Sequence, residues 1–337
     1  MQTRTYGDLF KLVQSLAGVT AFANNEQDDI ANLINRRYQT AYNTSQMWPR
    51  YLVESEERAL CSFTVSGIND SNTFYNWSGG YYKLGERANG EPCFIQAYHN
   101  YGNQPIVALK LDSSNYWVFV KAVTMSINTE GVVTLNSGFP LVSQVANDDG
   151  TYTDYSNPAE VPEWAVTGSG LSGFPIIKEV NLVPYEETYF RSELTLGGKT
   201  AKDDIGEPIR VHRNKAFLNN SALEYDFYNN EEGINILNIS GNSDNTAFVT
   251  YKKKFTPFTT SSNYTTSTEE VPGEFFQYIA YGAYADFLRM DGQHDKAQLE
   301  SENAELSLAQ QLERVDAIMN NNTTNKKFST YVNRQSR

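Results

Sequence analysis

Apolar residues near the N-terminus recur every three or four positions, which is the period of an amphipathic helix. Thr5 and Asp8 have the spacing of a capping box, and Gly18 is a typical residue for ending a helix. The pattern predicts a first helix between these signals. A second helix is predicted to begin near Asn24 or Asn25, because acids follow in its first turn and one side presents Ile30, Leu33, Ile34, Tyr38 and Ala41.

The same period returns near the C-terminus. Pro272 is predicted to be the first residue of a third helix, a position that proline suits, and the Asp291-Gly292 pair is predicted to end it. A last helix is expected after this pair, marked by Leu308, Leu312, Val315 and Met319. Since short one-faced helices need a packing partner, we expect residues 1–50 and 270–319 to form one bundle that is discontinuous in sequence.

The middle of the chain changes to short β-rich runs separated by turn-forming residues. Examples are residues 116–120, 131–135, 234–239 and 247–251. The sequence therefore predicts an α+β fold, in which a large antiparallel β insertion interrupts the small helical bundle. We expect a β-domain of residues 51–65 and 178–269, carrying an inserted β-module of residues 66–177, and an extended basic tail of residues 320–337.

Composition narrows the class of protein. The 337 residues are 40% hydrophobic and 20% charged, as in folded proteins, and no apolar run approaches the roughly 18 residues that would cross a membrane. The first ten residues lack the apolar region of a secretory signal, so we expect synthesis in a cytoplasm. Cys61 and Cys93 have no metal-ligand spacing, and we expect both to be free and partly buried.

Charge is distributed unevenly along the chain. The formal net charge of −13 argues against wholesale binding of nucleic acid, whose phosphates attract basic side chains. Residues 320–337 contain four basic residues and no acid, so the rest of the chain carries −17. A basic tail on an acidic body predicts a partner for the tail. Its candidate binding residues are Lys326, Lys327, Phe328, Tyr331, Val332, Arg334 and Arg337.

Motifs of catalysis and cofactor binding are weak in this sequence. Gly168, Gly170 and Gly173 match a dinucleotide-binding pattern, but Phe174-Pro175 follows and favours an extended exit, so we interpret the segment as a linker. Residues 147–150 resemble part of a calcium loop, but Val145 occupies the first ligand position, which favours a β-turn.

The three histidines, His99, His212 and His294, lie far apart and are expected at the surface. We therefore predict no catalytic residues, no cofactor and no metal. A glycosidase remains an open alternative, because two carboxylates need only meet in space.

Three of the four tryptophans, Trp77, Trp117 and Trp164, fall within residues 66–177. Such residues can form a sugar-binding or protein-binding surface, because large amphipathic rings give much contact area. They can equally form the core of a small β-sandwich. We favour the core for each of these side chains.

The order of these segments resembles the head-to-tail adaptor proteins of tailed bacteriophages, also called connector or neck proteins. The resemblance is carried by Ile30-Ala-Asn-Leu-Ile-Asn-Arg-Arg-Tyr38 with Trp48-Pro49, by Val271-Pro-Gly-Glu-Phe-Phe-Gln-Tyr-Ile-Ala280, and by Gly282-Ala-Tyr-Ala-Asp-Phe-Leu288. It covers residues 1–60 and 178–337. The block of residues 66–177 departs from the smallest members of that family, and its role stays open.

The resemblance implies a structural, non-enzymatic protein of the virion. Its helical part would form a ring, a dodecamer in that family, which joins the portal to the tail and continues the DNA channel without sequence-specific binding of the DNA. The implied partners are the portal protein, tail, nozzle or fibre proteins, and other copies of the chain; no membrane is implied. A virion adhesin that binds glycans or resembles a fibre is the alternative, which the aromatic block motivates.

Overall fold

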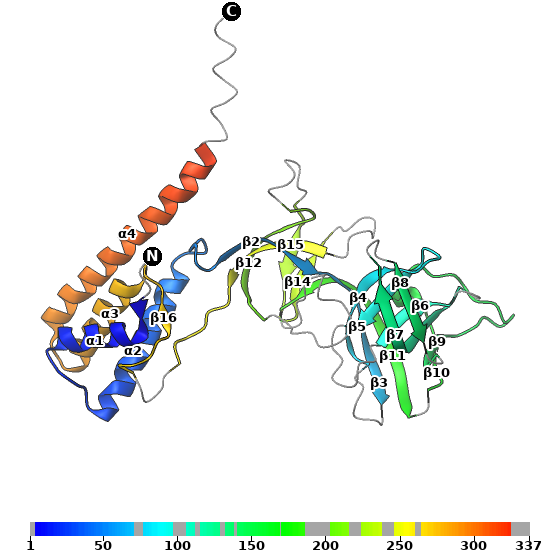
Figure 1. Ribbon diagram of the computed structural model, residues 1–337, viewed down its shortest axis with the longest axis horizontal. Coiled ribbons are helices and arrows are strands. Elements are labelled where there is room, and N and C mark those ends of the chain that lie inside the picture. The colour runs from blue at the N-terminus through cyan, green and yellow to red at the C-terminus, as the bar shows by residue number, and fades with distance from the viewer. Residues whose placement is uncertain are drawn as a thin grey trace, which may run out of the picture. The chain divides into compact units, whose positions relative to one another are not determined.

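The computed structural model has the α+β architecture that the sequence predicts, with helices at both chain ends and antiparallel sheets between them (Figure 1). It describes residues 4–70, 77–96, 106–111, 115–128, 132–137, 140–168, 170–185, 203–215, 224–237, 246–259 and 264–324. The chain forms two compact units. The helical unit contains the two ends, Met1–Leu52 and Lys252–Arg337, and the β-unit contains Val53–Tyr251.

In its described residues, the helical unit is a bundle of four helices with a short two-stranded sheet. In chain order its elements are β1 (Arg4–Thr5), α1 (Tyr6–Ala17), α2 (Asn24–Asn43), β16 (Glu270–Val271), α3 (Phe276–Met290) and α4 (His294–Thr324). Strand β1 pairs with β16, which ties the start of the chain to the residues before α3. The predicted capping box is present, since the side chain of Thr5 accepts a hydrogen bond from the Asp8 N–H at 3.1 Å. Gly18 ends α1 in the left-handed conformation.

Two predicted helix limits are corrected. Helix α3 begins at Phe276 rather than at Pro272, because Pro272 opens a turn in which its carbonyl oxygen accepts a hydrogen bond from the Phe275 N–H at 3.0 Å. Helix α4 continues to Thr324, so the first residues of the predicted extended tail, Asn320 to Thr324, are helical. The Asp291-Gly292 interruption between α3 and α4 is confirmed.

The core of the helical unit is rich in aromatic residues. Trp48 and Phe275 are fully buried and meet edge to face at 4.7 Å between ring centroids. Tyr38 stacks on Phe258 at 4.4 Å, so residues before and after the β-unit share one core. This shared core holds together chain ends that are more than 200 residues apart in sequence.

The described residues of the β-unit form two sheets. Strands β2 (Leu52–Ala59), β12 (Ile205–His212) and β15 (Thr246–Lys253) form a three-stranded sheet in the order β12-β15-β2. The larger sheet has 11 strands. In chain order these are β3 (Cys61–Asp70), β4 (Gly79–Glu86), β5 (Pro92–Gln96), β6 (Ile106–Lys110), β7 (Trp117–Ile127), β8 (Val133–Ser137), β9 (Val142–Gln144), β10 (Trp164–Val166), β11 (Leu171–Pro184), β13 (Phe227–Asn229) and β14 (Gly233–Ile236).

The large sheet is strongly curved and buries residues on both faces. Strand β8 pairs with β7, and a parallel bridge joins Val132 to Glu86, so strands β4 to β8 curl around a core of mainly aliphatic residues. The opposite face packs under residues 140–166 and forms an aromatic core. That cover includes a single turn of 3-10 helix, η1 (Pro158–Glu160).

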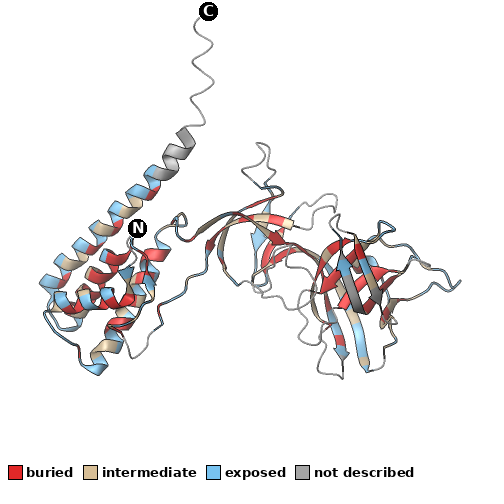
Figure 2. Ribbon diagram, viewed as in Figure 1, coloured by how far each residue is buried: buried red, intermediate tan, exposed pale blue. Residues whose placement is uncertain are grey.

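The tryptophans and cysteines of this unit are buried. Figure 2 shows that buried residues recur along the strands of the large sheet. Trp77 and Trp117 have no exposed surface and Trp164 has 8%, which confirms the core interpretation for these three side chains. Cys61 and Cys93 are free, as expected, but they are fully rather than partly buried. Burial raises the pKa of the Cys93 thiol to about 12.

Several sequence interpretations of this unit are tested by the structure. The interpretation of residues 168–173 as a linker is wrong in part, because β11 already begins at Leu171. The extended conformation predicted after Gly173 is confirmed. The β-turn is confirmed by a hydrogen bond of 2.9 Å from the Gly150 N–H to the Asn147 carbonyl. His294 is exposed, but His212 is buried within β12, and His99 lies outside the described residues. The predicted module limits at 66 and 177 fall inside the paired strands β3 and β11.

Two glycines lie where the paired strands β3 and β11 approach closely, next to a register shift in their pairing. Gly67 and Gly173 have φ angles of 83° and 99°, and a Cβ atom on Gly173 would lie 2.2 Å from the carbonyl oxygen of Gly67. Gly150 has a similar φ of 77° but open space around it.

We expect Gly173→Ala to lower the free energy of unfolding of the β-unit by more than about 2 kcal/mol. The alanine would adopt a strained φ, and the backbone at Gly67 would have to move away from the new Cβ atom. The matched change Gly150→Ala carries only the strain of roughly 1 kcal/mol. Urea unfolding followed by tryptophan fluorescence measures both. Equal effects of the two substitutions would contradict the steric argument.

Candidate assembly interface

Helix α4 presents two different faces along its length. Ala297, Ala304, Leu308 and Val315 recur at intervals of seven or four residues and are buried. Ala304, Leu308 and Val315 belong to the core of the helical unit, and α4 packs along α3. This face explains why α4 is part of the bundle.

The opposite face of α4 exposes apolar side chains. Leu299 is 60% exposed and Leu306 is 61% exposed. They are seven residues apart, so they lie on the same side of the helix, separated by about 10 Å along its axis. Met290, at the end of α3, is 61% exposed. We call the α4 surface around Leu299 and Leu306 the outer face. The seven-residue spacing places the two leucines on one side of the helix but does not predict that this side is exposed.

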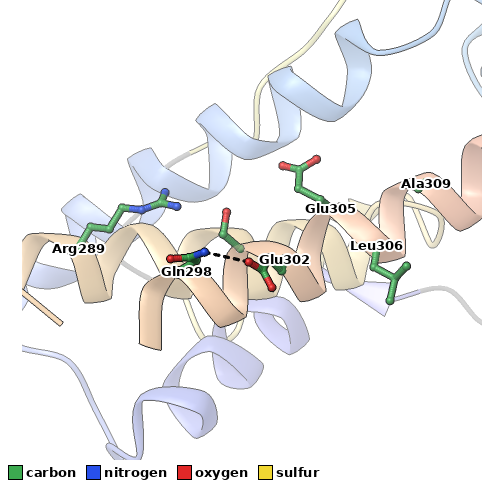
Figure 3. Close-up of a pocket in the computed structure, with 7 residues that line it drawn as sticks. Arg289, Gln298, Glu302, Glu305, Leu306 and Ala309 are labelled. Atoms are coloured by element: carbon green, nitrogen blue, oxygen red, sulfur yellow. Dashed lines mark hydrogen bonds between the residues drawn. The ribbon is translucent and has the colours of Figure 1, made fainter. Parts of the chain in front are cut away.

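A shallow groove of about 500 Å³ runs beside the outer face, bounded by residues of α3 and α4 (Figure 3). Its walls include Arg289, Gln298, Glu302, Glu305, Leu306 and Ala309. The side chain of Gln298 donates a hydrogen bond to Glu302 at 3.1 Å. Figure 3 shows Glu305 and Leu306 pointing to different sides of α4. The groove therefore combines apolar surface with carboxylates.

The charge on α4 contrasts with that on α1 and α2. Residues 294–324 contain six acids and two bases, Lys296 and Arg314. On the first two helices, Lys11 is exposed, and the side chain of Arg36 is 67% exposed. The same two helices also contain four acids, of which Asp8, Asp28 and Asp29 are exposed, so their surface is of mixed charge. The helical unit therefore offers an acidic, partly apolar face on α4 and a different surface on α1 and α2, and a subunit with two different surfaces is suited to head-to-tail contact with neighbouring copies.

Next to the groove, three guanidinium groups surround one buried carboxylate. Asp286 is 4% exposed and accepts two hydrogen bonds of 2.7 Å from Arg37, which is 12% exposed. Arg289 donates another at 2.7 Å and Arg36 donates one at 3.2 Å. Glu305 lies 3.7 Å from Arg37. The network joins α2, α3 and α4 beneath the surface of the unit.

The surroundings of Asp286 determine its protonation. Burial alone would raise the pKa of Asp286, but the hydrogen bonds and positive charge of Arg37, with the charges of Arg36 and Arg289, outweigh it and lower the pKa. The carboxylate is therefore ionised at neutral pH. In the sequence, Asp286 is notable only as an acid among the apolar residues of α3. This pattern does not show which basic residues surround it.

The predicted partner-binding residues of the tail, Lys326, Lys327, Phe328, Tyr331, Val332, Arg334 and Arg337, lie outside the described residues. Their interaction with a portal stays a prediction. The last described residue before them is Thr324, at the end of α4. The tail therefore continues directly from the helix that carries the outer face.

No family model, no curated protein and no solved structure matches this chain. Within the described part of the chain, no group of three or more His, Cys, Asp or Glu side chains is placed to hold a metal ion. Among the described helices, none combines the length and the apolar character needed to span a membrane.

Proposed function

We propose that this protein is a structural head-to-tail adaptor of a tailed bacteriophage, made in the host cytoplasm and incorporated in the virion. In this proposal several copies, twelve by the resemblance of its sequence to that family, form a ring between the portal and the tail. The ring continues the channel through which genomic DNA passes. The protein acts without catalysis, cofactor or metal.

The observation that carries the proposal is the outer face of α4. A ring needs two different surfaces on each copy that complement each other and repeat around a closed axis. The helical unit offers exposed Leu299 and Leu306 among acids on α4 as one such surface, and α1 and α2, with mixed charge, as a different one. Burying two leucines contributes about 3 to 6 kcal/mol per contact.

The β-unit is proposed to contact tail, nozzle or fibre proteins. In strand β11, Phe174 is 84% exposed and Ile176 is 53% exposed. Both follow Gly173, where the backbones of β3 and β11 approach closely. Exposed aromatic and aliphatic side chains on a rigid strand are typical contact residues. The adhesin alternative loses its first support, because the three tryptophans that motivated it are buried.

Electron microscopy and native mass spectrometry of the purified chain, alone and with its portal protein, test the proposal. We expect closed rings with one defined copy number, and a complex with the portal. A chain that remains monomeric at all concentrations and in the presence of the portal would contradict it.

Removing the tail should separate folding from portal binding. We expect truncation after Thr324 to leave the free energy of unfolding of the helical unit unchanged, because the removed residues follow the last turn of α4. Portal affinity should fall by at least about tenfold, and the intact chain should lose affinity with added salt more steeply than the truncated one, since four basic residues are removed. Titration by surface plasmon resonance at several salt concentrations measures both. Equal affinity of the two chains would refute the role of the tail.

A further inference from the structure

A small pocket of about 240 Å³ lies in the β-unit, apart from the proposed ring surfaces. One wall is formed by Ser156, Asn157 and Glu160, at and before the η1 turn. The other walls come from strands β3, β4, β5 and β11. Pro92 and the nearly buried Leu60 and Phe94 supply apolar surface.

The polar side chains of this pocket include both donors and acceptors of hydrogen bonds. Lys83 is an ammonium donor whose Nζ also donates to Glu86 at 3.4 Å, and Glu160 and Glu179 are carboxylate acceptors. The amide of Asn181 offers both kinds of group. Ser62, in strand β3, contributes a hydroxyl that can donate or accept.

Two of these groups are held in place by their neighbours. The carboxylate of Glu160 accepts hydrogen bonds from the Ser156 N–H at 3.1 Å and from the Ser156 hydroxyl at 2.9 Å. The Asn157 Oδ1 accepts one from the Ala159 N–H at 3.0 Å, which orients its amide nitrogen as a donor. Because these positions exist without a ligand, binding costs less side-chain entropy.

The combination selects among small ligands. A cation would contact only the carboxylates and would be repelled by the charge of Lys83. An anion would be repelled by the charges of Glu160 and Glu179. A sugar presents hydroxyls that each donate and accept, together with C–H groups that pack on Pro92 and Phe94. The volume is below the roughly 300 Å³ at which pockets for drug-sized ligands begin, so one sugar residue is the appropriate size.

We propose that this pocket binds a single neutral sugar residue, free or at the end of a glycan. Glu160, Glu179 and Asn181 accept hydrogen bonds from its hydroxyls, and Lys83 and Asn157 donate to its oxygens. The site is independent of ring assembly, so either proposal can fail while the other stands.

Saturation-transfer NMR of the full chain with glucose, galactose, N-acetylglucosamine and rhamnose, each at millimolar concentration, tests the proposal. Spermidine and inorganic phosphate serve as cationic and anionic probes. The pocket variants are Glu160→Gln and Asn181→Ala. The matched control is Glu163→Gln, an exposed glutamate of the same unit that does not line this pocket. Circular dichroism melting establishes that each variant is folded.

We expect at least one sugar to bind, and its affinity to fall about tenfold or more in each pocket variant but not in the control. Asn181→Ala removes a hydrogen bond to the ligand, and Glu160→Gln replaces a charged acceptor by a neutral amide with one acceptor oxygen. Absence of binding by all four sugars would overturn the proposal. So would binding of spermidine or phosphate alone, or a sugar signal that the pocket variants leave unchanged.

Discussion

Replacing Asp286 by asparagine is expected to destabilise the helical unit by about 3 to 5 kcal/mol, the largest effect on its folding that we anticipate from a single substitution. Asp286 is almost fully buried and receives hydrogen bonds from Arg36, Arg37 and Arg289. Asparagine has one acceptor oxygen, and its N–H₂ group would face guanidinium donors. The charge of Arg37, itself 12% exposed, would lose its nearest compensation.

The effect should depend on pH in a defined direction. The folded-state pKa of Asp286 is lowered, so its contribution is fully present above the unfolded pKa of about 4 and is lost as pH falls through the folded pKa. The difference in stability between the wild-type chain and Asp286→Asn should therefore be constant from about pH 5 to 8 and shrink below pH 4.

Urea unfolding followed by circular dichroism at 222 nm, which reports on the helices, measures this difference at each pH. Asp316→Asn is the matched control, because Asp316 is an exposed carboxylate of α4 with the same chemical change. The control should change stability by less than about 0.5 kcal/mol. A loss of stability below about 0.5 kcal/mol in Asp286→Asn, or a loss that does not shrink below about pH 4, would contradict the role assigned to the network.

The double substitution Leu299→Ala with Leu306→Ala is expected to weaken association between copies by roughly a hundredfold or more. Each leucine is about 60% exposed in the single chain and, by the proposal, becomes buried in the ring. Losing two such contacts removes about 3 kcal/mol or more, and each 1.4 kcal/mol is a factor of ten. The stability of the single subunit should not fall, because alanine favours helix and neither side chain belongs to its core.

The control is Asp148→Ala with Glu163→Ala, which truncates two exposed polar side chains of the β-unit, outside the outer face. Analytical ultracentrifugation over a range of concentrations gives the association constants. We expect rings to persist in the control and to dissociate in the leucine variant at the same concentration. If both variants assemble like the wild-type chain, the outer face is not the subunit interface, and the ring, where observed, uses other surfaces.

Local patterns in the sequence determined much of the helical unit. The capping box of Thr5 and Asp8 and the left-handed Gly18 fixed the limits of α1 because each acts on backbone groups within one turn. The α+β class and the discontinuous bundle followed from the change in hydrophobic period along the chain. The buried tryptophans followed from their large apolar area.

Only the tertiary structure decided features that depend on pairs of distant residues. Gly67 and Gly173 meet because β3 and β11 pair across more than 100 residues, so the glycine-rich segment that resembled a linker is part of a strand. Asp286 meets Arg37 across 249 positions, and the pocket joins Glu160 to strands β3 and β11. The outer face was hidden for a related reason: a leucine is exposed or buried according to which side of α4 packs on α3, and spacing alone does not say which side that is.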